Sequence, residues 1–141
     1  MSSERPWAVL WDMDGTLVDT AELHFDAWCR LCERLSRPFT RADFKATFGR
    51  RNPEIFQYLF PAGITEAESA WLGEEKEAMY RAATREKGVN LLPGAQELVV
   101  ELARAGARQA IGSSAPRGNL DLILELTGMG VHLGACVGME D

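Results

Sequence analysis

Two aspartates separated by a single residue, Asp12 and Asp14, are the residues of this sequence best suited to chemistry. In phosphoryl transfer one ionised carboxylate attacks phosphorus, a second carboxyl group carries the proton, and a magnesium ion screens the charge. Gly15 follows and allows a tight turn whose amides can face phosphate oxygens, while Thr16 adds a hydroxyl. The spacing therefore favours a phosphate site built on Asp12 and Asp14.

Two other interpretations of this motif need weighing. An Asp-Gly pair is also common in ordinary turns. A calcium-binding EF-hand loop contains Asp-x-Asp as well, but it needs glycine at its sixth position and glutamate at its twelfth. Counting from Asp12, those positions hold Leu17 and Leu23, which excludes the calcium loop. The choice between a turn and a phosphate site depends on the elements around the motif.

The elements around the motif indicate an α/β fold with a parallel sheet. The unbroken apolar run at residues 7–11 is typical of a parallel strand and ends at Asp12, where ligands bind in open α/β sheets. After residue 91 the pattern alternates between helix and strand, as in sheets with right-handed crossovers. We expect helices at 95–105 and 120–126 and strands at 109–111 and 135–137.

Between these parts the sequence predicts helices alone. Capping residues at Asp19, Thr40, Asn52 and Thr65 mark four helix starts, and apolar residues recur at helical spacing after each. We therefore expect three segments. They are core residues 1–18, a helical cap inserted at 19–90, and a continued core at 91–141 that is incomplete at its C-terminus.

Composition and charge limit the classes of binding partner that the sequence favours. The 141 residues carry a net charge of −6, which argues against nucleic acid or an anionic membrane, because both favour a basic surface. No apolar run reaches the ~20 residues of a membrane span, and residues 1–6 lack the features of a signal peptide. The expected location is cytoplasmic. Cys29 and Cys32 lie one turn apart in a predicted helix without further ligands, so we interpret them as packing residues.

Asp12-Met13-Asp14-Gly15-Thr16-Leu17-Val18-Asp19 resembles the first motif of the haloacid dehalogenase superfamily, and its β-phosphoglucomutase-like branch in particular. Residues 112–117 are similar to the second motif, and Leu92-Pro93-Gly94 to the return from the cap to the core. The resemblance implies a partial Rossmann-like parallel sheet with an inserted helical cap. It also implies a magnesium-dependent phosphatase of small phosphorylated metabolites, with sugar phosphates favoured. A phosphomutase and a non-catalytic remnant are the alternatives.

The resemblance also implies roles for the core residues. Asp12 would form an aspartyl phosphate, and Asp14 would protonate the leaving oxygen and then activate water. Mg²⁺ would bind the Asp12 carboxylate and the Asp14 backbone carbonyl. Ser113 and the Ser114 amide would hold the phosphoryl group, although ordinary helix-start chemistry explains both serines equally simply.

In the cap, the resemblance implies a substrate-facing group of residues. His24 and Trp28 lie one helical turn apart, and a core position is an equal alternative for Trp28. Lys76 matches a cap lysine of the family, with a solvated position on a charged helix as the alternative. Arg50 and Asn52 fall in the specificity loop. The mutases carry arginine at the position of Asn52, so its asparagine disfavours a mutase, and a helix cap would also explain it.

Two further motifs of the family, a lysine and an acidic pair, are not found before Asp141. The family's sheet places its first strand in the middle, flanked on one side by later strands. In this chain that strand would be a bare apolar edge. We therefore expect the 141 residues alone to be weak or inactive in catalysis unless a partner chain completes the sheet. The sequence predicts neither the individual substrate nor the oligomeric state.

Overall fold

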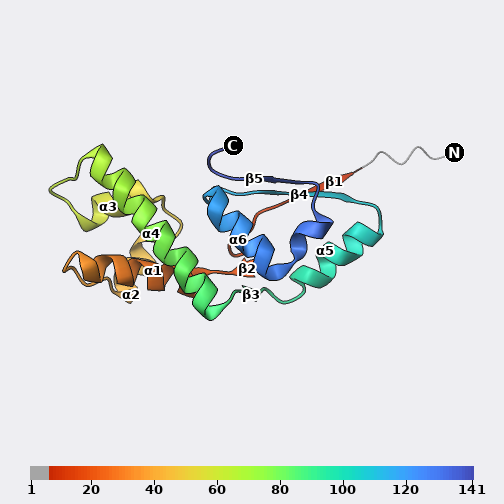
Figure 1. Ribbon diagram of the computed structural model, residues 1–141, viewed down its shortest axis with the longest axis horizontal. Coiled ribbons are helices and arrows are strands. Elements are labelled where there is room, and N and C mark those ends of the chain that lie inside the picture. Colours follow the sequence, from red (N-terminus) through yellow and green to blue (C-terminus); the bar gives the residue numbers. More distant parts are fainter. Residues whose placement is uncertain (1–6) are drawn as a thin grey trace. The chain divides into compact units, whose positions relative to one another are not determined.

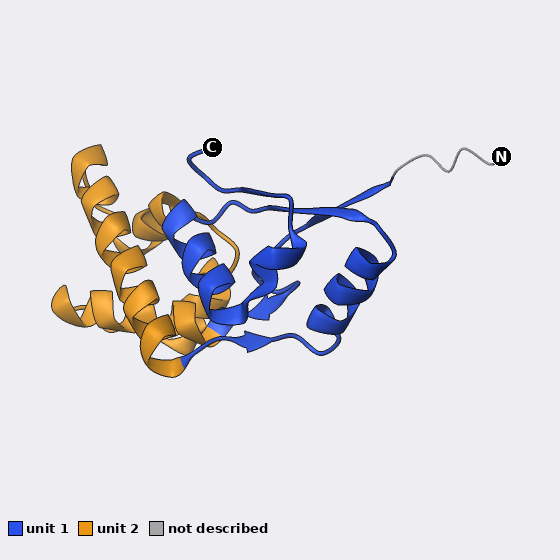
Figure 2. Cartoon of the chain, turned by 45° about the vertical axis from the view of Figure 1, so that its right-hand side comes forward, with its two compact units in different colours: residues 1–21, 88–141 blue, residues 22–87 orange. Residues whose placement is uncertain are grey.

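The computed structural model describes residues 7–141, which form two compact units. One unit contains the chain up to Ala21 together with Gly88–Asp141, and the other is Glu22–Lys87 (Figure 2). We call them the sheet unit and the helical unit. The prediction that residues 1–6 belong to no signal peptide lies outside the described residues.

The sheet unit is built on a three-stranded parallel sheet in the order β1-β4-β5. Its β-strands and α-helices are labelled in Figure 1. The elements are β1 (Ala8–Trp11), β2 (Val18–Asp19), β3 (Asn90–Leu91), α5 (Ala95–Arg104), β4 (Arg108–Gly112), α6 (Arg117–Thr127), the 3₁₀ helix η1 (Met129–His132) and β5 (Ala135–Val137). The predicted α/β class with a parallel sheet is confirmed. The short pair β2–β3 and the 3₁₀ helix carry too few residues for a periodic signal and were not predicted.

The strands β2 and β3 lie close to the two points at which the chain crosses from one unit to the other, and they pair with each other. The strands are antiparallel, with Val18 opposite Leu91 and Asp19 opposite Asn90. The Leu92 N–H also donates to the Leu17 carbonyl over 2.9 Å. The chain therefore leaves the sheet unit and returns to it at one paired point.

The loop that follows β1 is anchored by its own apolar residues. Met13, Leu17 and Val18 are almost fully buried in one cluster with Val99 of α5 and Ile111 of β4. Burying side chains of this size contributes about 1.5–3 kcal/mol each. The buried apolar residues of the loop therefore fix the positions of the polar residues that lie between them.

Within the described residues, β1 is an edge strand. It pairs with β4 alone, and its Leu10 side chain is 73% exposed. Trp7, just before it, is 53% exposed. The expectation of a bare apolar edge at the first strand is confirmed for this part of the chain.

The helical unit contains the rest of the helices. They are α1 (Ala21–Arg34, which begins at the last residue of the sheet unit), α2 (Arg41–Thr47), α3 (Asn52–Leu59) and α4 (Glu66–Lys87). Two predicted capping boxes are confirmed. Thr40 exchanges hydrogen bonds with Asp43, and Thr65 exchanges them with Glu68. These bonds satisfy amides that the first turn of a helix leaves unpaired.

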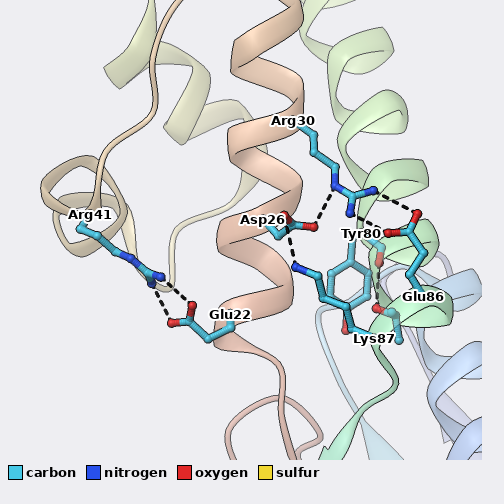
Figure 3. Close-up of polar contacts among 8 residues, drawn as sticks. Glu22, Asp26, Arg30, Arg41, Tyr80, Glu86 and Lys87 are labelled. Atoms are coloured by element: carbon cyan, nitrogen blue, oxygen red, sulfur yellow. Dashed lines mark hydrogen bonds and ion pairs between the residues drawn. The ribbon is translucent and has the colours of Figure 1, made fainter.

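Charged pairs join α1 to α4 on the surface of the helical unit (Figure 3). Arg30 binds Glu86 over 2.8 Å, and Lys87 lies 3.4 Å from Asp26. Exposed pairs of this kind contribute about 0–1 kcal/mol each. They help to align the helices, but the stability of the unit depends mainly on its interior.

The two cysteines of α1 behave as packing residues, as predicted. Cys32 is fully buried, and burial raises the pKa of its thiol to about 11. Burial also raises the pKa of Cys29, whose Sγ lies 3.6 Å from the Phe39 carbonyl oxygen. Reactive thiols have lowered pKa values, so the raised pKa values of this pair agree with a packing role.

Among residues 7–141, no helix combines the length and the apolar character that a membrane crossing requires.

Candidate functional site

Asp12 is the first residue beyond β1, and its side chain is exposed. One carboxylate oxygen, Oδ1, accepts a 2.8 Å hydrogen bond from the Met13 N–H. The last paired residues of β1 and β4 are neighbours in register, Trp11 opposite Ile111. Asp12 therefore lies at the same edge of the sheet as the residues that follow β4.

The loop after Asp12 closes through its own backbone. Gly15 has a φ of +76°, which the predicted tight turn requires. Its N–H, however, donates to the Val18 carbonyl over 2.9 Å, and the Thr16 N–H donates to the Met13 carbonyl over 3.2 Å. The prediction that amides of this turn face phosphate oxygens is therefore wrong for Gly15 and Thr16, because the turn itself uses their amides. The Thr16 residue is exposed.

Asp14 is oriented by a residue that the sequence analysis missed. The Thr20 hydroxyl donates to Oδ1 of Asp14 over 2.6 Å, and Thr20 is 3% exposed. A hydroxyl-to-carboxylate bond of this length is a strong one. A threonine six residues away carries no sequence signal for this role, because only the β2 turn brings the two side chains together.

In the product of the complete gene, Thr20→Val is expected to lower kcat by about 10-fold, because the Asp14 carboxyl group loses a partner that orients it and spends less time in the productive geometry. Thr20→Ser keeps the hydroxyl and should restore most of kcat. Steady-state kinetics of both variants measure the effect. A valine variant with unaltered kcat would show that this hydrogen bond does not position Asp14.

Ser113 and Ser114 follow β4. The Ser113 N–H donates to the Val137 carbonyl of β5, and its hydroxyl oxygen accepts from the Ala115 N–H over 3.1 Å. Helix α6 begins at Arg117 with Pro116 as its N-cap and no side-chain cap bond. The helix-start explanation for these serines is therefore wrong, because neither serine caps the helix. Ser114 is exposed at the same edge as Asp12.

Arg117 holds the C-terminal residues against the start of α6. Its guanidinium donates to the Cys136 carbonyl and to Asp141, and its backbone N–H donates to Glu140. The Gly138 N–H and Arg117 hold the pKa of Asp141 below its usual value. Residues 138–141 are thus folded back beside the second motif, near the end of β4.

In the helical unit, three of the predicted residues belong to one polar cluster. Lys76 is 3% exposed, so the solvated alternative for it is wrong. Its Nζ lies 3.0 Å from Nδ1 of His24 and 3.0 Å from Oε1 of Glu77. Asn52 donates through Nδ2 to the same Glu77 oxygen over 2.8 Å. Glu77 was not predicted, because a glutamate on a charged helix looks like any solvated one.

The other cap residues are divided between core and surface. Trp28 is 2% exposed and packs against Phe39 and Phe56, which places it in the core. Arg50 and Arg51 are exposed. Helix α3 takes Arg51 as its N-cap residue without a side-chain bond, so the interpretation of Asn52 as a helix cap is wrong.

The predicted residues thus form two groups. Asp12 follows β1, and Ser113 and Ser114 follow the neighbouring strand β4, so these three lie at the same edge of the sheet. Asp14 and Thr16 lie in the loop after β1. His24, Asn52 and Lys76 are gathered inside the helical unit, which Arg50 and Trp28 do not join.

Oxygen donors at the sheet edge suit a hard divalent cation. The Asp12 carboxylate is exposed beside Asp14, and Mg²⁺ is usually bound by one or two carboxylates together with water and substrate phosphate. Across residues 7–141 there is no group of three or more His, Cys, Asp or Glu that could hold a metal ion. The donor set therefore fits a cation such as Mg²⁺ only together with water and substrate phosphate as further ligands.

Comparison with known proteins shows what this chain is similar to. Over the full length of this chain, a pyrophosphatase, PpaX, of Bacillus velezensis is 30% identical. A β-phosphoglucomutase of Bacillus subtilis is 29% identical over 76% of the chain. The chain spans 63% and 50% of the length of these two relatives.

A crystal structure of a family IA, variant 3 hydrolase of Entamoeba histolytica, from the haloacid dehalogenase group, has the same fold. It superimposes with a TM-score of 0.82 at 26% identity, covering 90% of this chain and 57% of that one. The family of haloacid dehalogenase-like hydrolases matches residues 8–140. Since this match runs from β1 past β5 and includes both motifs, the chain belongs to the haloacid dehalogenase-like hydrolases.

Proposed function

We propose that this chain is the nucleophile-bearing part of a magnesium-dependent phosphatase that acts on small phosphorylated metabolites, with sugar phosphates as the favoured class. The observation that carries the proposal is the exposed Asp12 carboxylate at the end of β1, at one sheet edge with Ser113 and Ser114. The names of the two relatives, a pyrophosphatase and a β-phosphoglucomutase, denote reactions at phosphate groups.

In the first step, a carboxylate oxygen of Asp12 attacks phosphorus and the bond from phosphorus to the substrate oxygen breaks. The leaving oxygen takes a proton from Asp14. The Met13 N–H, already bound to Oδ1, favours attack by the other oxygen of Asp12. Ser113 and Ser114 hold the transferred phosphoryl group by hydrogen bonds.

In the second step, Asp14 takes a proton from a water molecule, which attacks the phosphorus of the aspartyl phosphate. Inorganic phosphate leaves and Asp12 is regenerated as a carboxylate. Thr20 keeps the Asp14 carboxyl group in one orientation through both steps. The Asp12 carboxylate and the Asp14 backbone carbonyl would hold Mg²⁺, which supplies compensation for the negative charge of the phosphoryl group when bound.

Removal of the metal is expected to abolish activity. The product of the complete gene, assayed with a panel of sugar phosphates, should release inorganic phosphate with added Mg²⁺. It should lose at least about 100-fold of this rate in excess chelator, because two carboxylates and a phosphate repel without a cation. Renewed Mg²⁺ should restore the rate. Full phosphate release in chelator would contradict the metal assignment.

A phosphomutase is the competing function. It would conserve phosphate and require a bisphosphate activator, whereas a phosphatase releases phosphate without one. Asn52 favours the phosphatase, because its amide is engaged by Glu77 and brings no positive charge for a second phosphate. A non-catalytic remnant would neither release phosphate nor gain thermal stability from beryllium fluoride with Mg²⁺, which mimics an aspartyl phosphate.

A further inference from the structure

Glu77 lies at the centre of the polar cluster in the helical unit. Its Oε1 accepts from two donors at once, Lys76 Nζ at 3.0 Å and Asn52 Nδ2 at 2.8 Å. Glu77 and Lys76 are 7% and 3% exposed, so these bonds are shielded from water. Hydrogen bonds to a buried charged acceptor are stronger than neutral ones at the surface.

The bond to Asn52 attaches the beginning of α3 to α4. Asn52 is the first residue of α3, and it follows the exposed pair Arg50–Arg51. A carboxylate only accepts, so Glu77 requires the amide nitrogen of Asn52, not its oxygen, to face α4. Because α3 has no side-chain cap, this bond is a side-chain link that fixes its first turn.

The bond to Lys76 sets the orientation of His24. A lysine ammonium only donates, so His24 Nδ1, 3.0 Å away, must be the acceptor and the ring proton must lie on Nε2. The His24 ring also stacks on Tyr80, with 4.2 Å between the ring centroids. The carboxylate of Glu77 therefore holds Asn52 directly and His24 through Lys76.

We infer that Glu77 is a positioning residue for substrate recognition: it places Asn52 and the Lys76–His24 pair in one fixed arrangement within the helical unit. It does not itself touch the substrate. The recognition role rests on the proposed function, whereas the attachment of α3 to α4 does not, so the two can be tested separately.

The attachment is tested by hydrogen exchange on the 141-residue chain. Asn52→Ala removes the side-chain donor of the bond to Glu77. Amides in the first turn of α3 should exchange at least about 10-fold faster in Asn52→Ala than in the unmodified chain, because the first turn loses its link. Glu74→Gln, an exposed neighbour on α4, is the matched control and should change nothing. Unaltered exchange in Asn52→Ala would overturn the attachment.

The recognition role is tested by a polarity swap in the product of the complete gene. Asn52→Asp brings two carboxylates together and should raise KM for a sugar phosphate by about 10-fold, with kcat within about twofold. Adding Glu77→Gln turns the pair into an amide donor and a carboxylate acceptor, and should return KM to within about threefold of the original. A merely structural role would change the melting temperature without this rise and recovery of KM.

The outcomes separate the two claims. A rise in KM that the double variant does not reverse would overturn the positioning role, as would an unaltered KM in Asn52→Asp. If no sugar phosphate is hydrolysed even by the unmodified protein, the proposed function fails. Recognition by Glu77 is then overturned with it, while hydrogen exchange still decides the attachment.

Discussion

In the product of the complete gene, Asp12→Asn is expected to lower the turnover number of the proposed phosphatase reaction by about 10⁴-fold or more, because a neutral amide cannot attack phosphorus and form the covalent intermediate. The fold should survive. The Asp12 side chain is exposed beyond the end of β1, and the buried neighbours Met13 and Leu17, not Asp12, anchor the loop. Substitutions at such exposed positions usually change the free energy of unfolding by no more than about 0.5 kcal/mol.

The measurement is phosphate release under saturating Mg²⁺, with urea unfolding of the same samples. Asp19→Asn is the matched control, because Asp19 is also exposed and lies in β2 within the same motif. Its turnover should stay within about threefold of the unmodified protein. Normal turnover by the Asp12 variant would mean that another group is the nucleophile.

Lys76→Ala is expected to lower the free energy of unfolding by about 3–5 kcal/mol, the usual cost of removing one partner of a buried ion pair. The substitution would leave the Glu77 carboxylate, 7% exposed, without the ammonium 3.0 Å away. It would also remove the donor to His24 Nδ1 and the charge that lies 5.6 Å from the ring centroid of Trp28.

Lys87→Ala on the same helix is the control. Lys87 pairs with Asp26 at 3.4 Å but is 53% exposed, so its loss should cost no more than about 1 kcal/mol. Urea unfolding followed by tryptophan fluorescence compares the two variants. Equal, small effects would mean that water compensates the Glu77 charge and that the cluster adds little stability.

Local patterns were sufficient for most of the fold. The apolar run before Asp12 predicted a strand, and β1 ends at Trp11, directly before the motif. The strand predicted at 135–137 is β5, and the one at 109–111 is the middle of β4. Capping boxes at Thr40 and Thr65 were predicted because they involve residues only three apart. Helix α6 begins at Arg117, three residues before its predicted start. Its N-cap residue, Pro116, makes no side-chain cap bond, so the usual sequence signal for a helix start is missing there.

The errors concern residues whose partners are distant in the sequence. Lys76 and Glu77 looked solvated on a charged helix, but contacts with His24 and Asn52 bury them. Asn52 before a proline looked like a cap, although its amide reaches a glutamate 25 residues away.

The sequence by itself determined the family and predicted the chemistry: two carboxylates after an apolar strand and a serine pair after a second strand predict phosphoryl transfer, because residue types and short spacings carry that information. Tertiary structure alone decided which side chains hold those groups in place. Thr20 orients Asp14, and Glu77 joins Asn52 to Lys76. The physical reason is that burial and hydrogen bonding between distant residues depend on how the chain turns and packs, and no local pattern records that.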